Sequence, residues 1–175
     1  ANLDCLHELG AHLVFFSPLA GDPLPACDAL WLPGGYPELH GAHLATRTDL
    51  WAQLRAHVAV GKPLLAECGG MMALFETLLD KQGVRHHMAG LLPGCVAMQP
   101  RLAALGIQMA ELPEGWVSGH TFHYSSSDTP LAPLLRAETQ DGRAGEAIYR
   151  RERLTASYVH FYFPSNPAAV AGLFL

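Results

Sequence analysis

Residues 63–72 join a short apolar run to a cysteine and two glycines, and few folds accommodate that order. The run from 63 to 66 favours a buried strand, Gly69 and Gly70 favour a sharp turn, and a helical pattern begins at Met71. A strand that turns directly into a helix is typical of α/β folds. At such a turn one residue takes an uncommon backbone conformation, and flanking glycines let strand and helix pack closely. We therefore expect the side chain of Cys68 to project into a pocket.

Cys68 has two interpretations. It lies where a nucleophile would lie, at the N-terminus of a helix whose dipole and unpaired N–H groups favour the thiolate. The alternative is a small buried cysteine beside a tight turn, which is the commoner state of a free cysteine. Residues 63–72 alone leave both interpretations open.

The composition excludes several functional classes. The 175 residues are half apolar and 15% charged, which predicts one globular domain over residues 1–175. The net charge of −5 and the lack of a basic run argue against nucleic acid or a membrane as partner. No apolar stretch reaches membrane-spanning length and the first four residues do not resemble a signal peptide, so we expect a cytoplasmic location.

The cysteines and histidines indicate neither disulfides nor a metal. The four cysteines, at positions 5, 27, 68 and 95, form no close pair. The ten histidines include His86-His87 and the pair His120 and His123, but no neighbouring cysteine or carboxylate completes a tetrahedral set. We expect free thiols and no metal site.

The first part of the chain predicts alternating helices and strands. A leucine repeat capped by Gly10 predicts an opening helix without a strand before it. An open parallel sheet normally begins on a strand, so we expect a piece of a longer polypeptide whose first strand is missing. The apolar patterns then predict strands at 12–16, 29–32 and 63–67, a proline-rich loop at 17–25 and a helix from about 50 to 61.

The second part predicts added antiparallel strands. The helix after Cys68 is expected to continue to residue 80, and residues 88–124 to form antiparallel strands. In the strand 119–125, the side chains of 120, 122 and 124 should share one face and those of 121 and 123 the other. We further expect a loop at 125–130, a hairpin of 134–139 with 146–149, a strand at 154–160 and a helix at 168–175.

The segment 33–38 carries a second pair of glycines at the end of a strand. Gly34 and Gly35 expose backbone N–H groups at the carboxyl end of the predicted strand 29–32, where sites in open α/β sheets lie. The pair forms either a simple turn or a backbone donor for an oxyanion. The second interpretation requires a nucleophile nearby. His160, 92 positions beyond Cys68 at the end of another strand, could serve that nucleophile as a base.

Four motifs together resemble one enzyme family. They are Leu30–Glu38, Ala66–Gly70, Gly119–Ser125 and Ala156–His160. They closely resemble the glutamine amidotransferase domain, of the class I type, of cobyrinic acid a,c-diamide synthases. The likeness covers nearly the whole chain. It implies an open, mostly parallel sheet flanked by helices, flavodoxin-like, with added antiparallel strands.

The resemblance also implies the chemistry. In that family the match to Cys68 is the nucleophile that attacks the glutamine amide, and the match to His160 is the general base. Backbone N–H groups of Gly69 and of Gly34 and Gly35 would hold the oxyanion. The motif residues His123, Tyr124 and Ser125 are expected to line the glutamine pocket.

The family joins this glutaminase to an amino-terminal synthetase domain. That domain uses ATP and Mg²⁺ to amidate the a and c carboxylates of cobyrinate or hydrogenobyrinate with the released ammonia. The phosphate-binding loop of the synthetase is not found in this sequence, so no cofactor is expected within residues 1–175. Partners implied are glutamine, the synthetase domain and, through it, a corrinoid.

One position departs from the wider class. Class I amidotransferases carry a glutamate two residues beyond the histidine to orient its ring, and here that residue is Tyr162. Either the pair works as a dyad or another group, such as Glu67 or Glu38, holds the ring.

Two other functions stay open. The ammonia could serve another tetrapyrrole amidation, as in cobyric acid synthase or nickel-sirohydrochlorin diamide synthase. The domain could also be a non-catalytic module that only docks on a partner. In either case, a missing strand would leave the piece prone to association or marginally stable.

Overall fold

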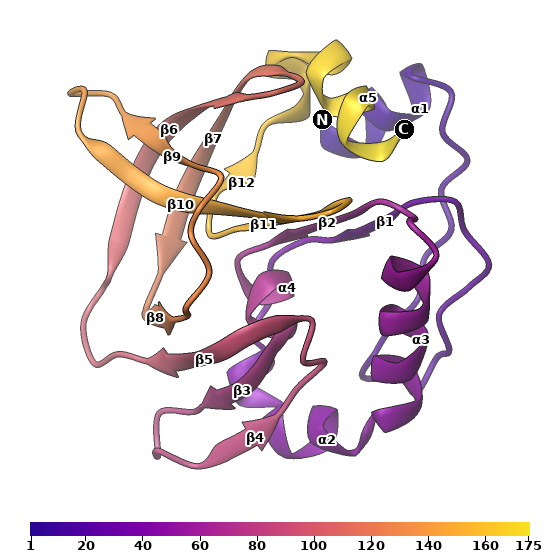
Figure 1. The fold of residues 1–175 in the computed structure, drawn as a ribbon, viewed down its shortest axis with the longest axis vertical. Coiled ribbons are helices and arrows are strands. Elements are labelled where there is room, and N and C mark those ends of the chain that lie inside the picture. Colours follow the sequence, from indigo (N-terminus) through magenta and orange to yellow (C-terminus); the bar gives the residue numbers. More distant parts are fainter.

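The computed structural model describes residues 1–175 as one α/β domain with twelve strands (Figure 1). In chain order, the elements are α1 Asn2–Glu8, β1 Leu30–Leu32, η1 Pro37–Leu39, α2 Gly41–Thr46, α3 Thr48–Ala59, β2 Leu64–Glu67, α4 Gly69–Met72, β3 Phe75–Leu79, β4 Arg85–His87, β5 Leu92–Met98, β6 Ala104–Leu112, β7 Gly115–His123, β8 Ser125–Asp128, β9 Leu135–Thr139, β10 Ala144–Arg151, β11 Leu154–Ser157, β12 His160–Phe161, η2 Phe163–Ser165 and α5 Pro167–Phe174. No helix has the length and apolar character needed to cross a membrane.

The strands form two sheets. The larger has eight strands in the order β1-β2-β11-β10-β9-β6-β7-β12, and the smaller has four in the order β4-β3-β5-β8. In the larger sheet only β1, β2 and β11 run parallel to one another, and every other neighbouring pair is antiparallel. The α/β class and the added antiparallel strands are confirmed. Parallel pairing in the larger sheet is confined to these three strands, and in the smaller sheet to β3 and β5, so both sheets are mixed rather than mostly parallel.

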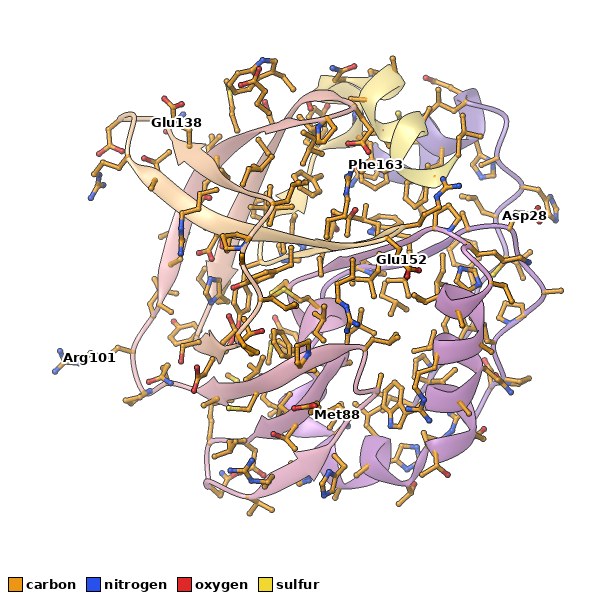
Figure 2. All side chains as sticks on the ribbon, viewed as in Figure 1. Asp28, Met88, Arg101, Glu138, Glu152 and Phe163 are labelled. Carbon is orange, nitrogen blue, oxygen red and sulfur yellow. The ribbon has the colours of Figure 1, made fainter.

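Strand β2 is buried on both faces and separates two apolar cores. Leu64 and Ala66 belong to the core under α2, α3 and α4, whereas Leu65 belongs to the core under α1 and α5. Successive strand residues point to opposite faces, so a central strand covered on both sides must be apolar in both directions. Figure 2 shows Phe163, a fully buried member of the second core, between α5 and the sheet.

Three predicted elements are wrong. Residues 12–16 join no sheet, and Val14 and Phe15 are 53% and 73% exposed. Apolar, β-branched residues favour a strand, but a strand also needs a neighbour to pair with, and this segment has none.

The helix predicted to run from Cys68 to residue 80 ends at Met72. Residues 75–79 instead form β3, which pairs in parallel with β5. Over a few residues the spacing of apolar side chains fits both the helical and the strand period, so pairing with another strand decides which element forms.

The serine-rich stretch expected to be a loop forms β8, Ser125–Asp128. It pairs antiparallel with β5 over Cys95–Met98. Serine has little strand preference of its own, and the neighbouring strand overrides it. The strand expected over 154–160 divides into β11 and the two-residue β12, which leaves β11 and pairs with β7 at the other end of the sheet. The other elements are confirmed to within a few residues, including the hairpin of β9 and β10.

Candidate active site

Cys68 occupies a strained turn between β2 and α4. Its φ of 45° and ψ of −111° lie outside the regions that non-glycine residues favour. The chain can turn this tightly because a side chain is absent at the next two positions. A Cβ atom on Gly69 would overlap the carbonyl oxygen of Gly35, and one on Gly70 would overlap that of Leu32. The predicted strand–turn–helix is confirmed, and strain of this kind clusters at functional sites.

The glycine loop after β1 lies against the base. A Cβ on Gly34 would overlap Cε1 of His160 and lie 3.3 Å from its Nε2, so the imidazole packs on the Gly34 backbone. The N–H groups of Gly34 and Gly35 donate no backbone hydrogen bond. The N–H of Cys68 donates to the carbonyl oxygen of Ser157 at 2.8 Å, which joins the ends of β2 and β11. The structure therefore brings Cys68, the Gly34-Gly35 loop and His160 to one edge of the sheet.

His160 is held at the start of β12. It pairs with His120 of β7, and the two rings stack with centroids 5.1 Å apart. Gly119 lets the strands approach, because a Cβ there would overlap the carbonyl oxygen of His160. Burial, and then the nearby His120 and His123, lower the pKa of His160 below its ordinary range. The imidazole is therefore neutral near pH 7 and able to accept a proton.

Cys68 differs from the prediction in one respect. Burial raises the pKa of its thiol to about 11, and the N–H of Gly69 offsets this only partly. The expected helix effect is weak because α4 has only four residues, Gly69–Met72. Nearby carboxylates, first Glu38 and then Glu67 and Glu146, also disfavour the thiolate. The predicted preformed thiolate is therefore wrong for the unliganded chain, whose resting pair is a neutral thiol and a neutral imidazole.

The carboxylate nearest to His160 is Glu67, the last residue of β2. Its Oε2 lies 4.0 Å from Nδ1 of His160, and its side chain is among the most deeply buried charged groups of the protein. Burial raises the pKa of Glu67 to about 7, although the two hydrogen bonds that its carboxylate accepts lower the pKa. Glu38, the other candidate, is half-buried and makes no ion pair with His160. Tyr162, at the position of the usual glutamate, is 51% exposed.

The remaining predicted site residues belong to a buried polar cluster. His123 directs Nδ1 at the carbonyl oxygen of Ser125 and Nε2 at Oε1 of Glu146, each at 2.9 Å. Its ring stacks on Tyr158 with centroids 3.7 Å apart, and the Tyr158 hydroxyl lies 2.9 Å from that of Ser125. Tyr124 is instead partly exposed and meets Phe122 edge to face. The pocket role of these residues stays a prediction.

Two members of the cluster, Glu146 and Tyr158, were not among the predicted site residues. Both interact electrostatically with Cys68: after burial and two other carboxylates, Glu146 raises the pKa of Cys68, and after burial, Cys68 raises the pKa of Tyr158. Tyr158 lies within the motif that ends at His160 and could have been suspected for that reason. Glu146 comes from a hairpin strand without any motif, so only the fold identifies it.

A family model agrees with this geometry. The CobB/CobQ-like glutamine amidotransferase domain matches residues 1–168. The chain belongs to this family. The strained turn at Cys68, His160 and the glycine loop thus lie within a glutamine amidotransferase domain.

Curated relatives share the domain and extend beyond it. The chain is 56% identical to a hydrogenobyrinate a,c-diamide synthase of Pseudomonas aeruginosa over 174 residues, which is 99% of this chain and 40% of that protein. It is 48% identical to a cobyrinate a,c-diamide synthase of Herminiimonas arsenicoxydans, with the same coverage. The amidotransferase domain thus spans about 40% of the length of these relatives.

Solved structures agree on the fold. A glutamine amidotransferase crystal structure superposes with a TM-score of 0.66 at 19% identity, covering 98% of this chain and 89% of the other. A second, from Thermotoga maritima, gives a TM-score of 0.61 at 13% identity and covers 91% and 68%. At such low identity the likeness concerns the fold of the amidotransferase domain alone.

Proposed function

We propose that this amidotransferase domain hydrolyses glutamine through a thioester on Cys68 and supplies the ammonia for amidation of the a and c carboxylates of a corrinoid. The observation that carries the proposal is that one glycine loop, Gly34-Gly35, lies against both the positive-φ turn of Cys68 and the ring of His160. A nucleophile, a neutral base and unused backbone N–H groups are the parts that acyl transfer requires.

The first half of the reaction forms the thioester. His160 accepts the thiol proton of Cys68 as the sulfur attacks the side-chain amide carbon of glutamine. N–H groups of Gly69 and of the Gly34-Gly35 loop hold the oxyanion that forms on the amide oxygen. The imidazolium then donates its proton to the leaving nitrogen, the C–N bond breaks, and ammonia departs. Proton transfer during attack, rather than a preformed ion pair, follows from the high pKa of the thiol.

The second half regenerates the enzyme. The neutral imidazole of His160 removes a proton from a water molecule, whose oxygen attacks the thioester carbon. The C–S bond breaks, glutamate leaves, and the proton returns to the sulfur of Cys68. In this scheme His123, Tyr124 and Ser125 shape the glutamine pocket, with His123 and Ser125 acting from within a hydrogen-bonded cluster.

The corrinoid half of the proposal rests on the relatives. Their names are those of hydrogenobyrinate and cobyrinate a,c-diamide synthases, and most of their length lies outside the matched segment. We expect a synthetase part, with ATP and Mg²⁺, to be encoded in the same polypeptide and to act in the cytoplasm. None of the chemistry on ATP is assigned to residues 1–175.

An exposed apolar face supports such a partner. Five large apolar side chains on one face of β6 and β7 are 46–69% exposed: Leu105, Ile107, Met109, Trp116 and Phe122. Cross-strand pairing places Leu105 opposite Phe122 and Ile107 opposite His120, whose ring stacks on His160, and Met109 follows on the same face of β6. Contiguous exposed apolar surface of this kind marks an interaction site. We propose that the synthetase part covers this face, which adjoins the base that releases ammonia.

Glutamate release tests the glutaminase half. The wild-type protein should convert glutamine to glutamate and ammonia, and Cys68→Ser should abolish the conversion. Absence of Cys68-dependent release, alone and with the synthetase part present, would favour the non-catalytic docking module instead. The identity of the acceptor is decided by offering hydrogenobyrinate, cobyrinate and other tetrapyrrole carboxylates to the protein with ATP and Mg²⁺.

The docking face has its own test in the two-part enzyme. Ile107→Ser combined with Phe122→Ser should lower the amide formed per glutamate released, while glutamate release itself continues. Val60→Ser, 72% exposed at the end of α3, is the matched control and should change neither quantity. If the double variant keeps the wild-type ratio of amide to glutamate, the synthetase part does not cover this face. Loss of a dimer at an unchanged ratio would show that a second copy of the chain occupies it, and an unchanged ratio without that loss would show that no partner does.

A further inference from the structure

We infer that Glu67 is the positioning residue for His160 and takes over the task of the glutamate that the wider class keeps two residues beyond the histidine. The inference rests on the proposed role of His160 as base. It concerns a residue of a different strand, β2, which also delivers Cys68.

Two donors fix the Glu67 carboxylate. Oε1 accepts the backbone N–H of Phe161 at 3.0 Å, and Oε2 accepts Nε1–H of Trp31 at 3.1 Å. A carboxylate held at both oxygens cannot rotate freely, so its direction toward the neighbouring imidazole is set before the reaction. Glu67 therefore comes preorganised.

The same bonds fix the backbone that carries His160. Phe161 follows His160 directly, and its N–H is bound to Glu67 while its carbonyl oxygen accepts Nδ2–H of Asn2 at 2.8 Å. The next N–H, of Tyr162, donates to the carbonyl oxygen of Ser118 at 2.8 Å. Glu67 is thus one of three anchors of β12 and the only one of them that carries a charge.

Strand geometry directs Glu67 and Cys68 to different faces of β2. Glu67 points with Leu65 toward the core under α1 and α5, whereas Cys68 belongs to the core under α4. Glu67 faces Nδ1 of His160 at 4.0 Å. A carboxylate opposite Nδ1 favours the tautomer with hydrogen on that nitrogen and leaves Nε2 free to accept a proton.

The carboxylate gains importance as the reaction proceeds. At 4.0 Å it is too far for a hydrogen bond to a neutral ring, and catalytic contacts of this kind often shorten only in the reacting complex. Once the ring has accepted the thiol proton, it is a cation beside a buried anion. The interaction is therefore stronger in the transition state than at rest, which is what raises a rate.

Other groups around His160 do not offer this interaction. His120 stacks on its ring and His123 lies further away, and as bases they disfavour a second positive charge. Cys68 is the proton donor. Glu67 is the one carboxylate within 4.0 Å of the ring. Tyr162 is exposed and carries no charge that could replace that of Glu67.

The test is an NMR measurement of the His160 imidazole in the wild-type protein, in Glu67→Gln and in the matched control Tyr162→Phe. The His160 signal is assigned by its loss in His160→Asn. At pH 8.5 we expect the Nδ1–H tautomer in the wild-type protein and in Tyr162→Phe, and a mixture in Glu67→Gln. The Glu67 carboxyl is ionised at this pH, because its pKa is about 7. The same tautomer distribution in all three proteins would overturn the inference.

Kinetics supply a second readout. In Glu67→Gln we expect kcat/KM for glutamine to fall about 10²-fold through kcat, with KM nearly unchanged. Trp31→Phe loosens the anchor but keeps the carboxylate, so at pH 8.5 it should retain the Nδ1–H tautomer of the wild-type protein. If it mixes the tautomers as much as Glu67→Gln does, the role of Glu67 is structural and the inference fails.

Two further outcomes also have a definite interpretation. If Glu67→Gln does not fold, Glu67→Asp replaces it, since the shorter carboxylate lies further from Nδ1 and should leave a smaller share of the Nδ1–H tautomer at pH 8.5 than the wild-type protein has; an unchanged tautomer would contradict the inference. If the wild-type protein releases no glutamate, the proposed function fails, but the NMR measurement of His160 still decides whether Glu67 positions it.

Discussion

The buried carboxyl of Glu67 makes a quantitative prediction about stability. Burial raises its pKa from 4.5 to about 7, whereas the unfolded chain keeps the ordinary value. Between these two pH values the folded state holds a proton that the unfolded state has released. The stability contributed by the protonated carboxyl is therefore complete below pH 4.5 and is lost as the pH rises through about 7.

The magnitude follows from the size of the shift. A pKa that moves from 4.5 to about 7 corresponds to a loss of about 3 kcal/mol of unfolding free energy above pH 7, at about 1.4 kcal/mol for each pH unit. Glu67→Gln cannot titrate and should not show this loss. Its amide oxygen can replace Oε1 at Phe161, but its NH₂ group would face the Trp31 N–H, and two opposed donors cost about 1–3 kcal/mol.

Denaturant unfolding at pH 5 and pH 8 provides the measurement. At pH 5 the wild-type protein should be more stable than Glu67→Gln by about 1–3 kcal/mol, and at pH 8 the variant should be about equal or more stable. His160 titrates in the same window with the opposite sign, but it is present in both proteins and largely cancels in their difference. Glu111→Gln, an exposed site on β6, is the matched control. Parallel pH profiles for wild type and Glu67→Gln would refute the reasoning.

Three further predictions concern the site itself. Gly34→Ala should lower glutaminase activity about 10²-fold, because the new Cβ displaces the His160 ring; unaltered activity would remove the loop from the site. With iodoacetamide at pH 7.5, Cys68 should react more slowly than the two half-buried cysteines, since it is buried and its pKa is about 11, and mass spectrometry of the labelled peptides would expose the opposite order. Tyr158→Phe should destabilise the fold by about 1 kcal/mol in urea unfolding, because the Ser125 hydroxyl loses its partner; a variant as stable as wild type would argue that this contact contributes nothing.

The sequence determined the features that depend on neighbouring residues. The turn at Cys68 follows from the apolar run before it and the two glycines after it, and the structure has it with a positive φ. The alternation in β7, with Thr121 and His123 buried and Phe122 exposed, follows from the period of a strand. These are local rules, so the residue order is sufficient to apply them.

Only the tertiary structure decided what depends on distant partners. The sequence predicted a strand at residues 12–16 and a loop at 125–130, yet residues 125–128 form the strand, because β5 lies beside them. Glu67 and Glu38 were equal candidates until packing placed one of them 4.0 Å from His160 and left the other half-buried. The thiol of Cys68 is protonated for the same reason: burial outweighs a four-residue helix. Pairing, burial and the distance between charges are set by the whole fold, and residue order alone does not specify them.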